Sequence, residues 1–568
     1  MAVFPANQGS GQVNSSKGAI MTGAIGWRRG LGAMVAATVL VGAWSSAAAA
    51  AEADRVQYNG IELPAVWPPP AKDFPDAPQR PPYLVSPPQV IPIDVGRQLF
   101  VDDFLIEATT LKRTFHLPEY HAGNPVLKPD KPWEMTGRGP FAIPFSDGVW
   151  YDPQDGTFKM WYYAGHGGAA TCYATSKDGI RWEKPALDVE SGTNIVLRTA
   201  RDSGTVWLDP KPRELGERFK MALYHGTFML YRSPDGVHWT KVSAGGKTGD
   251  RSTFFYNPFR QRWVYSIRSS SRLGRSRNYW ETTDFFGFSD ASQVTLWTAA
   301  DSGDWQRDDL KTRPQLYNLD CAAYESVLLG LFSIWRGDYR SPSTDKAKEL
   351  LQAGRPKQNS ICVGFSRDGF HWDRPDRRAF LPTSETRGDW NWGNVQSTVP
   401  CCLVVGDQLW FYVSGRAGKS FPGCQAVDAG GSTGLARLRR DGFASMDADE
   451  ADGTLTTRPI RFRGKHLFVN LAASQGQLLA EVLDEQGRPL APFDRHHCRP
   501  LTGDNTRHAV TWEGAEDLSA LSGKPIRLRF HLARGSLYAF WVTPDAGGAS
   551  FGYVAGGGPG LRGPVDAP

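Results

Sequence analysis

Short runs of apolar and aromatic residues, each bounded by Gly, Asp or Pro, dominate the chain from about residue 93 onward. Runs of this length with such boundaries are typical of β-strands joined by tight turns. Helical periodicity is rare, and the best helix candidate is residues 345–353, where Lys and Glu flank Leu350 and Leu351. The pattern therefore predicts an all-β protein.

A seven-residue motif, Ser-x-Asp-Gly-x-x-Trp, recurs within this pattern. It occurs at residues 176–182, 233–239 and 366–372, and degenerate copies follow at 289–297 and 440–443. The Asp-Gly step suits a tight hairpin, because glycine adopts a positive φ without steric cost. Each copy belongs to a unit that reads as four strands. Five such units predict a five-bladed β-propeller over residues 93–452.

The pattern changes on either side of these units. Residues 453–545 alternate apolar with polar or small residues, which predicts a β-sandwich whose strands each bury one face. Residues 52–92 are rich in proline and predict an extended N-terminal arm. Residues 546–568 are rich in glycine and predict a loosely ordered tail.

The first 51 residues have the composition of a signal peptide. The pair Arg28–Arg29 precedes an apolar run from Leu31 to Trp44, and the small residues Ala47–Ala51 follow. The apolar run is shorter than the ~20 residues that a membrane span needs. We therefore predict a signal peptide at 1–51, an exported protein in the periplasm or outside the cell, and no membrane attachment after processing. An N-terminal anchor helix is the alternative.

Charge and cysteine content exclude several classes of partner. The formal net charge of the 568 residues is +5, but without Lys17, Arg28 and Arg29 the chain carries 61 basic and 59 acidic groups. This balance argues against a nucleic-acid partner. Seven cysteines without CxxC spacing predict buried thiols, and no metal or other cofactor is predicted. Nothing in the sequence indicates an oligomeric state.

Two segments carry a resemblance to a known group of enzymes. They are Ser-Asp-Gly-Val-Trp-Tyr-Asp at 146–152 and Arg-Asp-Ser-Gly-Thr-Val-Trp at 201–207. Together with the propeller-plus-sandwich plan, they resemble glycoside hydrolase family 32 and the related families 43 and 68, and also exported bacterial family-32-like proteins. The resemblance implies a nucleophile or base in blade one, a stabilising Asp in blade two and a Glu acid in blade three.

The resemblance transfers unevenly to this chain. Blade two supplies Asp202, within a segment similar to the Arg-Asp-Pro motif of family 32. In blade one the family's nucleophile position falls on Phe145, and Asp147 is the nearest carboxylate. In blade three the corresponding position is Asp250, without a Glu-Cys-Pro motif, and the best internal Glu is Glu325, one blade later. The predicted catalytic residues are Asp147, Asp202, Asp250 and Glu325.

A propeller also gathers the first residues of its innermost strands around one axial pocket. Clustered carboxylates repel one another, so one of them should hold its proton near neutrality. A protonated acid beside an ionised carboxylate is what glycosidic cleavage needs. The residues predicted to bind substrate are Arg251, Asp320, Trp390, Trp392 and Asn394. The basic loop at 268–277 is interpreted as a solvated rim, with a clamp for acidic or sulfated sugars as the alternative.

The sequence thus predicts an exported glycoside hydrolase that cleaves a poly- or oligosaccharide with axial carboxylates. Three other functions stay open. A non-catalytic glycan-binding propeller would keep pocket aromatics without needing the carboxylates. A structural exported protein would tolerate changes in the pocket, and a glycan phosphorylase would need phosphate and a basic pocket.

Overall fold

The computed structural model describes residues 55–137, 139–288, 294–337, 358–418, 430–450 and 452–568. The predicted signal peptide, the predicted helix at 345–353 and Cys424 lie outside these residues. The described residues hold a single α-helix, α2 (Pro82–Val85), and their other regular structure is almost entirely β. No helix among them is long and apolar enough to cross a bilayer. The all-β prediction is confirmed.

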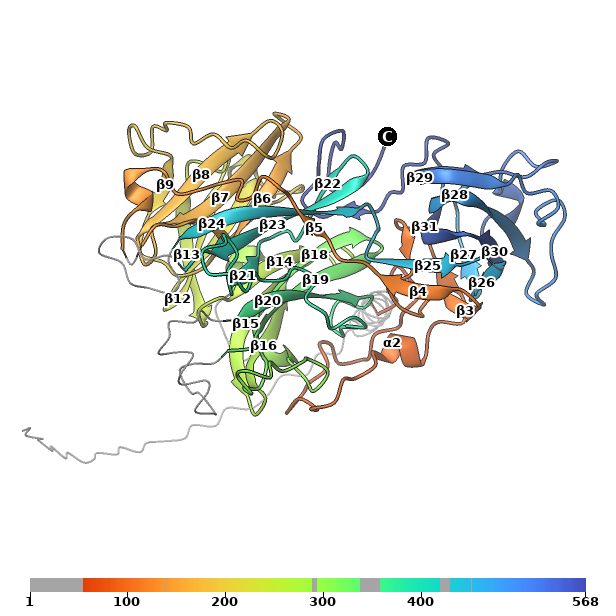
Figure 1. The fold of residues 1–568 in the computed structure, drawn as a ribbon, viewed down its shortest axis with the longest axis horizontal. Helices are drawn as coiled ribbons and strands as arrows, with labels where there is room; N and C mark the ends of the chain where they lie inside the picture. The colour runs from red at the N-terminus through yellow and green to blue at the C-terminus, as the bar shows by residue number, and fades with distance from the viewer. Residues whose placement is uncertain (1–54, 138, 289–293, 338–357, 419–429, 451) are drawn as a thin grey trace, which may run out of the picture. The chain divides into compact units, whose positions relative to one another are not determined.

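Three consecutive four-stranded antiparallel sheets form the first three blades of a propeller, each with its strands in chain order (Figure 1). Blade one holds β6 (Ala142–Asp152), β7 (Thr157–Ala164), β8 (Ala170–Ser176) and β9 (Ile195–Arg198). Blade two holds β10 (Gly204–Leu208), β11 (Phe219–His225), β12 (Thr227–Ser233) and β13 (Thr240–Lys247). Blade three holds β14 (Thr253–Asn257), β15 (Arg262–Ser271), β16 (Gly274–Thr282) and β17 (Thr295–Ala299).

Blades four and five complete the ring. Blade four holds β18 (Gln315–Glu325), β19 (Val327–Trp335) and β20 (Asn359–Ser366). Blade five holds β21 (Val395–Ser397), β22 (Leu403–Val405), β23 (Gln408–Arg416) and β24 (Gly431–Arg439). Its outermost strand is β5 (Glu119–Tyr120), which precedes blade one in the chain and pairs with β24. An N-terminal strand therefore closes the ring, and the predicted five-bladed propeller is confirmed.

Each complete copy of the repeated motif forms the turn that follows the third strand of its blade, and this turn contacts the neighbouring blade. In each complete copy the Ser hydroxyl accepts a hydrogen bond from the Gly N–H three residues later, at 2.8–3.0 Å. The glycine takes a positive φ in every copy, between 71° and 85°. The turn then packs against the preceding blade: Trp161 of blade one donates to the Gly236 carbonyl (2.7 Å), and Tyr412 of blade five donates to the Gly179 carbonyl (2.7 Å). The motif thus fixes both the hairpin and the contact between blades.

The C-terminal strands form one continuous nine-stranded sheet around its own hydrophobic core. Its centre is β28 (His466–Leu483), which pairs with β29 (Leu501–Val510), β30 (Arg527–Ala533) and β31 (Gly535–Thr543). The remaining strands are β25 (Ala444–Ala448), β26 (Gly453–Thr457), β2 (Gln98–Leu99), β3 (Ile106–Thr109) and β4 (Lys112–Phe115). Four of these five strands fall within the span predicted for the propeller. Their pairing partners lie hundreds of residues away, so no local pattern identifies them.

Both flanking segments are fixed to the rest of the protein. The proline-rich arm ends in β1 (Ile91–Pro92), which pairs in parallel with β27 (Ile460–Arg461), and its Asn59 side chain donates to the Arg367 carbonyl. The glycine-rich tail contains β32 (Tyr553–Val554), which pairs with the end of β18. The expectation of a loosely ordered tail therefore does not match the structure, because the tail's backbone is hydrogen-bonded to blade four.

The cysteines lie inside the hydrophobic cores, as predicted from their number and spacing. Within the described residues all of them are buried and none forms a disulfide. Five lie in the propeller core and one in the core of the C-terminal sheet: Cys172, Cys321, Cys362, Cys401, Cys402 and Cys498.

The turn contact between blades one and two can be tested with two alanine substitutions. Gly236 and Gly226 have nearly the same φ, +82° and +79°, but a Cβ on Gly236 would lie 2.4 Å from the Trp161 ring, whereas nothing lies within 4 Å of a Cβ on Gly226. We expect Gly226→Ala to cost about 1 kcal/mol through backbone strain alone. Gly236→Ala should cost about 1–3 kcal/mol more, because the blades must separate.

Urea unfolding followed by tryptophan fluorescence measures both effects. Equal losses in the two variants would contradict a stabilising role for this contact.

Candidate active site

The innermost strands of the blades meet around the axis of the ring, and hydrogen bonds join four blades there. Strand β6 contacts β10 and β21, and β14 contacts β10 and β18. Ser146 of blade one donates to Asp320 of blade four (2.9 Å), which also accepts from Ser397 of blade five (2.7 Å). Arg251, which precedes blade three, donates to the Ser146 hydroxyl (2.9 Å). These contacts define the axial cluster.

Two residues of the axial cluster have an unusual backbone conformation. Ser146 and Arg251 lie in the left-handed region, with φ of 64° and 60°. Such strain costs on the order of 1–3 kcal/mol per residue and is concentrated at functional sites. In β6 the pairing register with β7 also shifts between Ile143 and Gly148, which turns Ser146 toward the axis. The sequence gives no signal for Ser146, because neither the shift nor the strain leaves a motif.

Asp147 is fully buried and paired. It forms an ion pair with Arg201 at 2.6 Å, and both side chains have no exposed surface. Arg201 also donates to Thr171 (2.9 Å) and lies over the Tyr163 ring. Burial raises the pKa of Asp147, against the opposing effect of Arg201. Asp147 therefore lies next to Ser146 of the axial cluster but does not reach solvent. Asp320 is likewise only 1% exposed.

Asp202 and Asp250 are the two axial carboxylates that reach solvent. The Asp202 carboxyl forms no hydrogen bond or ion pair with any of the described residues, and its backbone N–H donates to the Tyr224 carbonyl (2.9 Å). Burial raises the pKa of Asp202, and repulsion from Asp250 adds to the shift. Asp250 forms an ion pair with Arg268 at 2.7 Å. The structure therefore places a carboxyl with a raised pKa near a carboxylate that is ion-paired.

Two buried arginines surround these carboxylates. Arg251 donates to the backbone carbonyl of Phe145 (2.9 Å), and its guanidinium carbon lies 4.0 Å from the centre of the Phe145 ring. Arg277 donates to the carbonyls of Arg251 (2.7 Å) and Tyr317. Neither forms an ion pair with a described carboxylate. Burial lowers the pKa of Arg251, and burial together with repulsion from Arg251 lowers the pKa of Arg277 to about 9.

The basic loop of blade three does not act as one surface. Arg268 pairs with Asp250, whereas Arg272 pairs with Asp73 of the N-terminal arm. Arg275 lies over the Trp335 ring at 4.2 Å, and Arg277 is buried. Neither the predicted rim nor the predicted clamp describes this loop as a whole, because its arginines differ in burial and have different partners.

Glu325 lies at the opposite end of the axis from the carboxylates it was predicted to join. Five residues of extended strand, about 16 Å, separate it from Asp320 on β18. It is fully buried and accepts hydrogen bonds from Arg440 (3.1 Å) and Ser550 (2.7 Å). The structure therefore does not bring Glu325 together with the other predicted catalytic residues.

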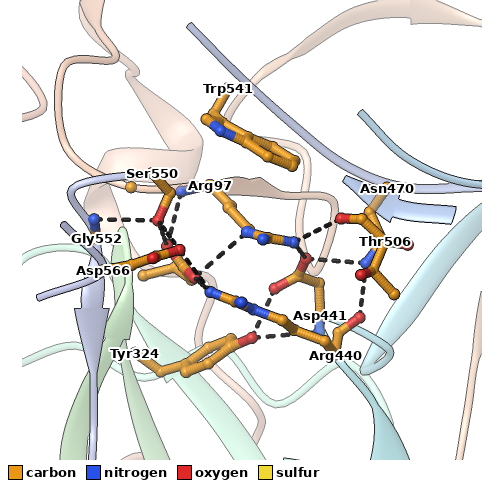
Figure 2. Close-up of polar contacts among 12 residues, drawn as sticks. Arg97, Tyr324, Arg440, Asp441, Asn470, Thr506, Trp541, Ser550, Gly552 and Asp566 are labelled. Atoms are coloured by element: carbon orange, nitrogen blue, oxygen red, sulfur yellow. Dashed lines mark hydrogen bonds and ion pairs between the residues drawn. The ribbon is translucent and has the colours of Figure 1, made fainter. Parts of the chain in front are cut away.

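The polar network around Glu325 joins the propeller to the C-terminal strands (Figure 2). Arg97 donates to Asp441 (2.8 Å) and stacks on Trp541 at 4.1 Å. Asp441 also accepts from Tyr324 (2.6 Å) and Asn470 (2.9 Å). Arg440 completes the network through Asp566 at 2.7 Å. Every charged group of the network has an opposite charge as a partner, which indicates a structural junction.

The predicted substrate-binding residues of blade five separate into two groups. Trp390 packs on the sheet itself, where a Cβ on Gly434 would lie 2.0 Å from its ring, and it contacts Tyr120 of the closing strand. Trp392 is only 6% exposed and lies under Arg387. Asn394 is buried and accepts from Gln396 (3.1 Å) near the start of β21. The structure thus gives both tryptophans packing roles and leaves Asn394 near the axis.

The described residues contain no group of three or more His, Cys, Asp or Glu side chains arranged to hold a metal ion. The polar groups near the axis are instead carboxyl, hydroxyl, amide and guanidinium groups. Such a set can bind polar ligands, transfer protons and stabilise charge without a metal.

No protein-family model matches the chain, and no curated protein matches it. Among solved structures, the chain is similar to propeller-type glycoside hydrolases. A member of the GH130 family of mannoside phosphorylases, which contains hydrolases that target β-1,2 mannosidic linkages, has a TM-score of 0.38 at 12% identity, covering 59% of this chain and 97% of that one. An N-acetylgalactosamine deacetylase from F. plautii has a TM-score of 0.37 at 12% identity, covering 60% of this chain and 96% of that one. A thermostable family-43 glycoside hydrolase has a TM-score of 0.35 at 13% identity, covering 53% of this chain and 93% of that one.

These similarities are too low to transfer an activity or a substrate to this chain. The function must be argued from the axial cluster itself.

Asp147 is ion-paired and Asp202 is not, so removing each carboxylate should change the free energy of unfolding in opposite directions. The folded-state pKa of Asp202 is raised above 3.8, so its protonated form contributes stability that is present below pH 4 and lost as pH rises through the folded pKa. We expect Asp202→Asn to be more stable than the parent at pH 7.5, with the gain disappearing toward pH 4. Asp147→Asn should lose about 3–5 kcal/mol at pH 7.5, because Arg201 is left as an unpaired buried charge.

Urea unfolding of the parent and both variants at pH 4.5 and 7.5 provides the comparison. An Asp202→Asn variant less stable than the parent at pH 7.5 would show that the carboxylate is a stabilising ion.

Proposed function

We propose that the protein is an exported glycoside hydrolase that cleaves a glycan in its axial pocket, with Asp202 as the proton donor. The observation that carries this proposal is the state of Asp202: partly exposed, without a hydrogen-bond partner among the described residues, and with a pKa raised by burial and by Asp250. A glycosidic oxygen leaves readily only when an acid protonates it. A carboxyl that holds its proton and faces solvent is suited to that step.

Asp250 supplies the second carboxylate in this proposal. Its ion pair with Arg268 orients it near Asp202. It then attacks the sugar carbon or activates a water molecule, while Asp202 protonates the leaving oxygen. The resemblance to family 32 implied a stabilising role for the Asp of blade two. The raised pKa of Asp202 supports an acid role instead.

The buried residues of the axial cluster support these two groups. Asp147 neutralises Arg201, and Asp320 fixes Ser146 and, through it, Arg251. Two half-buried tyrosines, Tyr224 and Tyr317, lie close enough to Asp202 and Asp250 for the carboxylates to raise their pKa values, although burial is the larger cause. Aromatic rings beside polar groups suit a sugar, which presents apolar C–H faces and hydroxyl edges.

A non-catalytic glycan-binding propeller is the second candidate. The observation that favours it is in blade one, where Phe145 occupies the position of the family's nucleophile and its ring is covered by Arg251. Blade one thus presents no exposed carboxylate to the pocket. Export rests on residues 1–51, whose basic, apolar and small-residue segments follow the order of a signal peptide.

Product release from a broad glycan panel tests the proposal. The parent should release reducing sugar from at least one glycan, and Asp202→Asn and Asp250→Asn should each lower the rate by about 10²–10⁴-fold, because each removes a proton-transfer or charge-stabilising group. The matched control is Asp188→Asn. Asp188 has a side chain that is 79% exposed and pairs only with His238 on a blade surface, so its rate should equal the parent's.

Retained glycan binding without any product from the parent would reject hydrolysis and favour the binding propeller. If Asp202→Asn and Asp250→Asn both released product at the parent's rate, cleavage would depend on other residues.

A further inference from the structure

Arg416 reaches the axial cluster from blade five. It is the last residue of β23 and pairs through its backbone with Gly431 of β24. Its guanidinium lies over two rings at the start of blade one, 5.2 Å from the centre of Phe141 and 5.4 Å from that of Phe145. The residue is 6% exposed. The two rings therefore hold the guanidinium in place without satisfying its N–H donors.

The guanidinium of Arg416 forms no hydrogen bond and no ion pair with any residue that the structure describes, and its Nε is fully buried. Other buried arginines of the propeller differ. Arg367 is bound by Asp102 (2.7 and 2.9 Å) and Arg374 by Asp304. A guanidinium has five N–H donors, and a buried charge without a partner is costly. Arg416 is thus a fixed cation whose donors are available to a ligand.

The surroundings of Arg416 favour an anionic ligand. Arg416 lies close enough to Asp202, Arg251 and Tyr317 to influence the pKa of each. Neither Arg251 nor Arg277 forms an ion pair with a described carboxylate, so together with Arg416 they outnumber the unpaired Asp202 carboxyl. Of the remaining carboxylates, Asp147 is paired with Arg201 and Asp250 with Arg268, and Asp320 is held by two hydroxyls. The pocket beside Asp202 therefore has an excess of positive charge.

We propose that the axial pocket recognises a sugar that bears an anionic group, a carboxylate or a sulfate ester, and that Arg416 binds this group. The inference rests on the proposed function, because it names the substrate class of the same pocket. A planar guanidinium matches the paired oxygens of either group, and an ammonium does not. An anion bound there also disfavours ionisation of Asp202, which keeps the proton donor protonated. The recognition comes from blade five, whereas the basic loop of blade three is occupied by other partners.

Calorimetric titration with matched oligosaccharides tests this recognition. The probes are oligogalacturonate, the same oligosaccharide after reduction of its carboxyl groups to alcohols, and a sulfated galactan oligosaccharide with its desulfated form. We expect the parent to bind at least one anionic probe about 10–100-fold more tightly than its neutral counterpart, as for hydrogen bonds to a charged group. Preference for the uronate or for the sulfate ester identifies which anion the pocket takes.

Three variants assign the effect to Arg416. Arg416→Gln should lose the preference for the anionic probe, and Arg416→Lys should recover only part of it. Arg437→Gln is the matched control: Arg437 also stacks on an aromatic ring, at 4.6 Å from Trp410, and has no ion pair among the described residues, but it lies toward the other end of the β23–β24 pair. This control should bind as the parent does. Circular dichroism melting checks the fold of each variant, and the matched probes on the parent still decide the case if Arg416→Gln does not fold.

The outcomes separate this inference from the proposed function. Equal binding of the anionic and neutral probes by the parent would overturn the inference, while loss of neutral-glycan hydrolysis in Asp202→Asn would still support the hydrolase. An anionic preference that depends on Arg416, with no cleavage of any glycan, would support the inference and reject hydrolysis. Loss of the preference in Arg437→Gln as well would show a general charge effect and overturn the role of Arg416.

Discussion

The arrangement of the axial pocket depends on how the ring closes. Strand β5 pairs with β24, so the chain must run along blade five before it can begin blade one. The same path continues at Leu127, which pairs with Thr433, and at Phe141, which pairs with Gly431. The start of β6 is therefore held against the end of β23. That contact places Phe141 and Phe145 under Arg416 and turns the strained Ser146 toward the other blades.

Once the ring is closed, the axial charges divide into two groups by burial. The buried carboxyls have partners inside the protein, as Asp147 has Arg201 and Asp320 has two hydroxyls. The carboxyls that reach solvent are Asp250, which pairs with Arg268, and Asp202, which has no described partner. Because charge interactions are strong where water is excluded, small differences in partner and burial decide which carboxyl has a raised pKa. For Asp202, burial and the nearby Asp250 raise the pKa.

The network around Glu325 has similar residue types and a different role. It contains two arginines and three carboxylates, all buried, and each charge has a partner of opposite sign (Figure 2). Replacing any one of them would leave a buried charge unpaired. Its charged residues come from the segment directly before β2, from β18, from the end of blade five and from the C-terminal tail, so the network ties these segments together. A count of carboxylates on innermost strands therefore does not distinguish a reactive pocket from a structural junction.

The amino-acid sequence by itself determined the five blades. It did so because a blade is a local structure: its strands follow one another, and its Ser-x-Asp-Gly-x-x-Trp turns are closed by hydrogen bonds within a few residues. Only the tertiary structure decided that Asp147 and Asp320 are sealed, where Glu325 lies, that Trp390 packs on its own sheet, and that Arg416 lies over Phe141 and Phe145. The closing strand, the N-terminal strands of the C-terminal sheet and the docked tail were also decided there. Each of these depends on a partner far away in the chain, and burial and pairing with such a partner leave no pattern in the neighbouring residues.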